Sequence, residues 1–140
     1  MMPGLILKLG PGERVMVNGV VMENGPRRTR INILTPEANV LRLRDAIHPH
    51  EVNTPVRRVC YVAQMVLAGE AEEGEARRQL LTGVEQLSQV FADPDSRARL
   101  SEATEHALDG RYYQALKTLR TLLPREERLM GLCAAPARSA

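Results

Sequence analysis

Paired arginines are the residues of this 140-residue sequence whose spacing could do chemistry. Arg28 and Arg30 stand two apart among small and apolar residues, and so do Arg42 and Arg44. Residues two apart on an extended strand share a face, so we expect each pair to project from one sheet face. We expect neither Arg42 nor Arg44 to be buried. Two interpretations remain open: a solvated outer face, or contact with nucleic-acid phosphates, to which Arg brings bidentate geometry.

Basic residues are concentrated in the first 50 residues of the chain. Seven Lys or Arg residues, Lys8 among them, stand there against four acids, whereas the rest of the chain holds 12 against 13. A further pair, Arg57 and Arg58, follows a predicted helix cap, where positive charge opposes the helix dipole. We interpret this pair as a solvated helix face or as secondary contacts to RNA or a partner.

Other candidate chemistry is weak. His48 and His50 have no further ligands at zinc spacing nearby, so a loop pair is favoured over a metal site. Cys60 and Cys133 make no disulfide framework, which favours a reducing cytoplasm, and no apolar run approaches the ~20 residues of a membrane span. Neither a P-loop lysine nor a nucleophile elbow is present. We predict a cytoplasmic protein that is not an enzyme and needs no cofactor.

Short extended segments precede residue 47. They are 5–9, 14–17, 20–23, 28–34 and 40–44. Asn18-Gly19 and Asn24-Gly25 are hairpin signals, because Asn and Gly tolerate the positive φ of a type I′ turn. The pattern predicts an antiparallel meander, and the lack of room for a crossover helix excludes a parallel sheet.

The apolar period changes to about 3.6 residues after Asn53. Thr54-Pro55 and Asp93-Pro94 predict capped helix starts, and Gly69 and Gly110 predict stops. Apolar stripes at Val56 to Leu67, Leu80 to Phe91 and Tyr112 to Leu123 predict buried helix faces, with Pro124 ending or kinking the last helix.

The predicted fold is therefore α+β, with a small antiparallel sheet followed by three or four antiparallel helices. We expect a basic β segment over 1–50, a helical domain over 51–131 and a disordered tail over 132–140. A β segment of this size buries little apolar surface. We therefore expect a homodimer whose interface includes residues 5–34.

Five motifs in a fixed order resemble one protein family. They are Leu-Gly-Pro-Gly-Glu-Arg (9–14), Val-Asn-Gly-Val-Val (17–21), Glu-Asn-Gly-Pro-Arg-Arg (23–28), Thr-Pro-Val-Arg-Arg (54–58) and Gly-Arg-Tyr-Tyr-Gln-Ala-Leu-Lys (110–117). Over residues 5 to 129 this series resembles the FlbT family of bacterial flagellin regulators. The resemblance implies binding to the 5′ untranslated region of flagellin mRNA, which limits its translation or stability.

A second, weaker resemblance concerns residues 5–47. Residues 31–47 are similar to the last two strands of the CsrA family of mRNA-binding translational regulators, and residues 5–17 to its opening strand and Gly-Glu turn. It implies that Arg44, with Arg42 beside it, contacts RNA. No aromatic residue lies in residues 1–50, so we expect arginines and edge-strand backbone, not stacked bases, to carry recognition.

The segment Gly110-x-Tyr112-x-x-Ala115-Leu116 resembles half of a tetratricopeptide-like hairpin. Core packing is the favoured interpretation. The alternative is a groove in which Tyr112, Tyr113 and Leu116 hold an amphipathic partner helix. The corresponding alternative function is an interaction or chaperone-like module that binds flagellin or the flagellar regulator FlaF.

Overall fold

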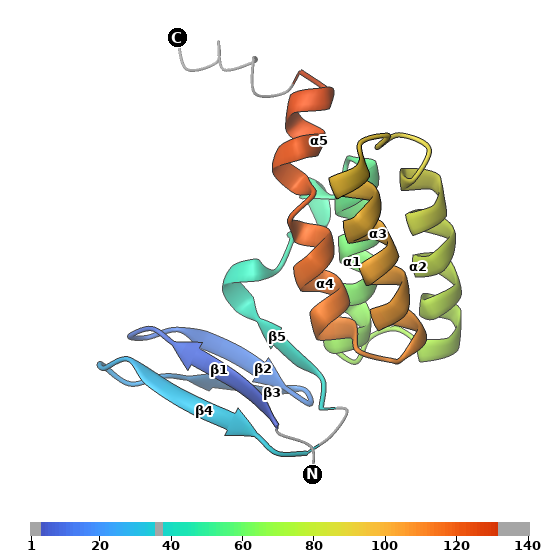
Figure 1. The fold of residues 1–140 in the computed structure, drawn as a ribbon. Coiled ribbons are helices and arrows are strands. Elements are labelled where there is room, and N and C mark those ends of the chain that lie inside the picture. Colours follow the sequence, from blue (N-terminus) through green and yellow to red (C-terminus); the bar gives the residue numbers. More distant parts are fainter. Residues whose placement is uncertain (1–3, 36–37, 132–140) are drawn as a thin grey trace, which may run out of the picture.

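Five short strands open the described part of the chain and form two small antiparallel sheets (Figure 1). The computed structural model of the chain describes residues 4–35 and 38–131. The strands are β1 (Leu5–Leu9), β2 (Arg14–Val17), β3 (Val20–Glu23), β4 (Thr29–Ile33) and β5 (Val40–Arg42). β1 pairs with β4, whereas β2 lies between β3 and β5. All of these pairs are antiparallel, as predicted.

The strand order is not the predicted meander. Among the described strands, only β2 and β3 form a hairpin, at Asn18-Gly19, where φ is 50° and 85° as a type I′ turn requires. Asn24-Gly25 does not turn β3 back onto β4, because β4 pairs with β1. Instead, the Asn24 side-chain amide donates to the carbonyl of Gly10 (2.6 Å). Asn24 therefore fixes the chain where it crosses from one sheet to the other.

The inward faces of the two sheets share a small apolar cluster. Its buried members are Leu7, Leu9, Val15 and Val40. Because side chains alternate along a strand, Ile6 and Lys8 of β1 point to the opposite face, and both are exposed. The outer face of the β1–β4 sheet is therefore open to a ligand.

The last strand is shorter than predicted. The sequence pattern extends it to Arg44, but β5 ends at Arg42 and a 3-10 turn, η1 (Leu43–Asp45), follows. A second 3-10 turn, η2 (Pro49–Glu51), leads to the helices. Arg42 and Arg44 therefore do not share one strand face, and their positions must be taken from the tertiary structure.

Five α-helices follow the strands within residues 38–131. They are α1 (Pro55–Leu67), α2 (Glu73–Leu87), α3 (Pro94–Leu108), α4 (Tyr112–Arg120) and α5 (Leu123–Leu129). Both predicted caps are confirmed: the Thr54 hydroxyl accepts from the backbone N–H of Arg57 (3.3 Å), and the Asp93 carboxylate from that of Ser96 (2.9 Å). Pro124 lies in the first turn of α5, where its missing N–H costs nothing.

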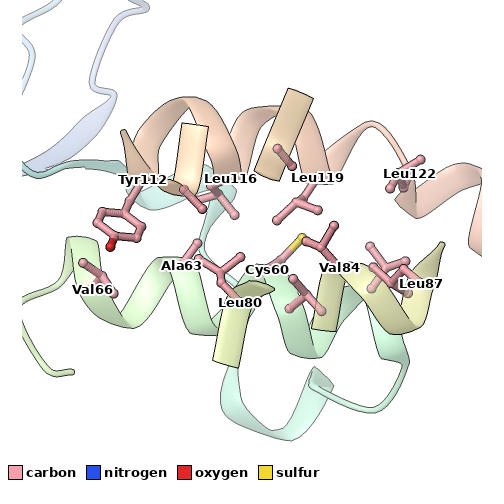
Figure 2. Close-up of a cluster of buried hydrophobic side chains, with 14 of the residues drawn as sticks. Cys60, Ala63, Val66, Leu80, Val84, Leu87, Tyr112, Leu116, Leu119 and Leu122 are labelled. Atoms are coloured by element: carbon pink, nitrogen blue, oxygen red, sulfur yellow. The ribbon is translucent and has the colours of Figure 1, made fainter. Parts of the chain in front are cut away.

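The main core lies between α1, α2, α3 and α4 (Figure 2). Figure 2 shows Leu116 and Leu119 of α4 pointing toward Cys60 of α1. A Cβ added to Gly83 in α2 would lie 2.6 Å from Cγ2 of Val59 in α1. The close approach of these two helices explains a glycine inside a helix, where it otherwise costs about 1 kcal/mol relative to Ala.

The strands lie together on one side of the helical region and contact it at a few points (Figure 1). Tyr113 of α4 packs against both apolar clusters. Arg120 of α4 donates to the carbonyl of Asp45 (3.0 Å), and the Gln64 side chain pairs with both backbone groups of Ile47 (2.6 and 3.1 Å). Among the described residues, no helix is long and apolar enough to cross a membrane.

Candidate nucleic-acid interface

A cleft of about 1030 Å³ lies between β1, β4, the η1 turn and α4. Seven of its described lining residues are cationic: Lys8, Arg28, Arg30, Arg42, Arg44, Lys117 and Arg120. One described lining residue, Asp45, is acidic. The fold therefore brings together five predicted basic site residues from three separate segments of the sequence, and adds two from α4.

Two of these cations lie next to each other on the adjacent strands β1 and β4. Lys8 is paired directly opposite Arg30. Like charges opposite each other destabilise an antiparallel pair by a fraction of a kcal/mol. Lys8, Arg30 and the neighbouring Arg28 are exposed, and none of them has an ion-pair partner among the described residues. The free protein therefore carries a local electrostatic conflict that a bound anion would relieve.

Arg42 differs from our expectation, because it is buried, with 9% of its surface exposed. Its Nη2 donates to the Lys8 carbonyl (2.7 Å), and its Nη1 lies 3.4 Å from Oε2 of Glu13, which is itself buried. The Arg42 Nε has no hydrogen-bond partner among the described residues. Burial is tolerated because Glu13, just before β2, supplies the opposite charge. Arg42 thus lines the cleft and also hydrogen-bonds to the backbone of β1.

Arg44 is the more available of the two arginines after β4. Its side chain is 62% exposed, and its Nε lies 3.5 Å from Oε2 of Glu13 and 4.0 Å from Oδ1 of Asp45. Glu13 is buried, but the Arg44 side chain itself is exposed to solvent, which screens its attraction to both carboxylates. Because Glu13 keeps Arg42 as its buried partner, Arg44 can turn toward a phosphate without leaving the Glu13 carboxylate unpaired.

Helix α4 forms the opposite wall of the cleft, which the sequence pattern did not predict. Tyr113, Lys117 and Arg120 line it, whereas Tyr112, on the adjacent face of α4, is buried. The spacing of 113, 117 and 120 was the available signal, because residues three and four apart share one helix face. Nothing in the sequence alone indicated that this face meets the basic strands.

Arg57 and Arg58 lie outside the cleft. The Arg57 guanidinium donates to the side chain of Asn53 (3.0 Å) and pairs with Glu127 (3.6 Å). Arg58 lines a smaller groove of about 520 Å³ between α1 and α2. The structure therefore does not bring this pair together with the other candidate RNA contacts.

The proposed partner-helix residues separate into two groups. Tyr112 and Leu116 are core residues with 3% and 2% of their surface exposed, so they present almost no surface to a partner. Burial raises the pKa of Tyr112, and the hydrogen bond that its hydroxyl accepts from Arg77 (3.2 Å) opposes this rise. Tyr113 is half-buried and lines the basic cleft.

Two ionisable side chains, Glu126 and Cys60, are buried outside the cleft. The Glu126 carboxylate of α5 accepts from the Thr54 hydroxyl (2.6 Å) and from the backbone N–H of Val56 (2.9 Å), so it joins α5 to the start of α1. Burial raises the pKa of the Cys60 thiol to about 12, which keeps it protonated at neutral pH.

The rings of His48 and His50 lie close together. The ring centroids of His48 and His50 are 4.1 Å apart. The described part of the chain contains no group of three His, Cys, Asp or Glu side chains placed to hold a metal ion. Cys133 lies outside the described residues.

Comparison with known proteins identifies relatives over most of the chain. Residues 5–130 match the family described as flagellar protein FlbT. A probable flagellum biosynthesis repressor protein FlbT of Brucella anthropi is 32% identical over 130 residues, which cover 93% of this chain and 84% of the relative. The flagellum biosynthesis repressor protein FlbT of Caulobacter vibrioides is 30% identical over 127 residues, 91% of this chain and 89% of the relative. No solved structure matches the chain.

Proposed function

Because the chain belongs to the FlbT family of flagellar proteins, we propose that it regulates flagellum synthesis by binding the 5′ untranslated region of flagellin mRNA. In this proposal, binding limits the translation or stability of the message. The protein acts as a cytoplasmic regulator without catalysis or a cofactor. The regulatory role follows the names of its relatives, and the RNA contact is argued from the basic cleft.

The observation that carries the RNA proposal is the placement of Lys8 directly opposite Arg30. A sheet selected for stability alone avoids such a pair. An RNA strand carries a phosphate at every nucleotide, and Lys and Arg side chains are the usual phosphate contacts of nucleic-acid-binding proteins. Arg28 and Arg44 line the same cleft as this pair and add to its positive charge.

Titration of a labelled flagellin 5′ leader RNA, followed by fluorescence anisotropy, tests this function. Arg28→Gln with Arg44→Gln removes two exposed cations of the cleft. We expect weaker binding and a salt slope, d log K/d log[salt], that is less steep by about 1.4, since each phosphate contact contributes about 0.7 for single-stranded nucleic acid.

The matched control is Arg97→Gln with Arg128→Gln. Both residues are exposed, lie outside the cleft and have no ion-pair partner among the described residues. The control changes the net charge equally, and we expect it to leave the slope unchanged. Equal effects of the two double variants would mean that the binding is non-specific attraction to net charge.

The smaller groove supports a second candidate function. Arg58, Arg78, Gly83 and Val90 line it, and Val90 is an exposed apolar residue. Such a surface suits a partner protein, and flagellin and the flagellar regulator FlaF are the candidates. Pull-down of flagellin or FlaF that persists after nuclease treatment, and is lost in Val90→Lys, supports this function. Loss of the pull-down with nuclease favours the RNA function.

The strand β3 supports the proposal of a homodimer. Val20, Val21 and Met22 are 59%, 53% and 38% exposed, although neighbouring residues of a strand point to opposite faces. β3 is also an outer strand of its sheet, so one of its backbone edges is unpaired within the described chain. Edge strands with apolar side chains readily pair with a second chain.

A further inference from the structure

The basic cleft has a second wall that is not part of the strands. Tyr113, Lys117 and Arg120 of α4 line it opposite the strand cations. Lys117 is exposed and has no ion-pair partner among the described residues, whereas Arg120 is tied to Asp45 (Nη2 to Oδ1, 3.7 Å). Cations therefore face the cleft from both sides, which suits a strand of RNA that lies between them.

The cleft also contains apolar surface from both walls. Ile6 of β1 is 51% exposed within it, and the half-buried Tyr113 lines it from α4. Among the described residues, none forms a hydrogen bond with the Tyr113 hydroxyl. A purely electrostatic phosphate site does not need an exposed isoleucine or an aromatic ring. Proteins that hold single-stranded RNA combine a positive groove with aromatic rings on which unpaired bases stack.

We infer that the α4 face is the second wall of the RNA site, where Tyr113 stacks an unpaired base and Lys117 contacts a phosphate. This inference rests on the proposed RNA function and deepens it. It departs from the expectation that recognition uses no stacking, because the fold brings Tyr113 from the helical half to the cleft beside the strands. A stacked base must be unpaired, so the site selects single-stranded over double-stranded RNA.

Three labelled probes separate stacking from phosphate contact: a single-stranded oligo(A) 10-mer, a 10-mer of the same backbone without bases, and a 10-base-pair RNA duplex. Wild-type protein should prefer oligo(A) to the abasic strand by about fivefold to 150-fold, which is the effect of one stacked base. Tyr113→Leu should abolish most of this preference, whereas Tyr113→Phe, which keeps the ring, should retain it.

Lys117→Gln provides a second test that does not depend on changing the half-buried Tyr113, because Lys117 is exposed. This variant should fold as the wild type does, keep the preference for oligo(A) over the abasic strand, and make the salt slope less steep by about 0.7. Arg97→Gln, on the exposed face of α3, is the matched control and should change neither quantity.

The outcomes distinguish this inference from the proposed function. Suppose that the strand variant Arg28→Gln with Arg44→Gln weakens binding but Lys117→Gln leaves the salt slope unchanged. The inference that α4 contacts RNA is then wrong, and the proposed RNA function remains supported. If the Tyr113→Leu variant keeps the wild-type preference for oligo(A), the inference that Tyr113 stacks a base is wrong. Duplex binding as tight as oligo(A) binding also overturns it. Absence of binding to every probe and to the flagellin leader overturns both the inference and the function.

Discussion

The Glu13 carboxylate lies 3.4 Å from the Arg42 guanidinium, and each side chain is about nine-tenths buried. Removing one member of a buried ion pair leaves an uncompensated charge and costs about 3–5 kcal/mol. Because Gln can still accept hydrogen bonds, we expect Glu13→Gln to lower the free energy of unfolding by about 3 kcal/mol, near the low end of that range. Urea denaturation measures this change.

Glu23→Gln is the control for that experiment. Glu23 also pairs with an arginine, Arg14 (2.9 Å), but both side chains are more than half exposed. Exposed pairs contribute at most about 1 kcal/mol. Losses of equal size in the two variants would show that Arg42 does not depend on Glu13.

Leu116 tests the packing of α4 on the bundle. Its side chain is 2% exposed, so Leu116→Ala removes buried methyl groups and should lower the free energy of unfolding by about 2–5 kcal/mol. Leu108→Ala is the matched control, because Leu108 is 56% exposed, and it should change stability by about 0.5 kcal/mol or less. A loss below about 1 kcal/mol for Leu116→Ala would indicate that Leu116 is exposed and would favour the interpretation that it binds a partner helix.

The chemistry of Cys60 follows from its burial. Its thiol is fully buried and its pKa is raised to about 12, so almost no thiolate is present at pH 8. In a Cys133→Ser background, we expect a disulfide reagent such as dithionitrobenzoate to modify Cys60 only after urea is added. Rapid modification of the native protein at pH 8 would contradict the packing of α1 against α4.

The dimer proposal is tested at the centre of β3. Val21→Lys places a charge on the exposed outer strand, and charged side chains at strand edges oppose pairing with another chain. Light scattering should report a dimer for the wild type at micromolar concentration and a monomer for the variant. Val90→Lys, an exposed residue near the end of α2, controls for added charge and should remain a dimer. A monomeric wild type at micromolar concentration would show that the dimer proposal is wrong.

Local signals predicted most of the secondary structure. Asn18-Gly19 specifies its hairpin because both residues accept positive φ, and Thr54 and Asp93 specify helix starts because each caps a nearby N–H group. Asn24-Gly25 has the same local signal as the first turn, but its outcome depends on which strand pairs with β1. That choice is made by tertiary packing, which a local pattern does not contain.

The sequence predicted only part of the candidate site, because tertiary packing also decides which side chains meet there. Arg30 points outward as strand alternation suggests, and Arg28 is exposed although β4 begins one residue later than predicted, at Thr29. Arg42 is buried because Glu13, distant in sequence, neutralises it. The α4 wall lies far from the strands in sequence and joins them only through tertiary contacts such as those of Tyr113. Residue type and spacing therefore identified the cations, and the fold was needed to show which of them meet.

The opposed pair Lys8 and Arg30 allows the most direct test of RNA binding, because it predicts opposite changes in affinity and stability. The measurement is the salt dependence of binding to the flagellin leader, with thermal unfolding of the same samples. Four phosphate contacts from Lys8, Arg28, Arg30 and Arg44 give the wild type a slope of about −2.8 or steeper, which is roughly fifty-fold weaker binding at 200 mM than at 50 mM salt.

Lys8→Gln with Arg30→Gln should make that slope less steep by about 1.4 and weaken binding, while Tm rises because the like-charge repulsion across the sheet is gone. Weaker binding together with a higher Tm would establish that these two cations are placed for RNA at the expense of stability. A slope and affinity equal to those of the wild type would contradict the central claim that the cleft binds RNA.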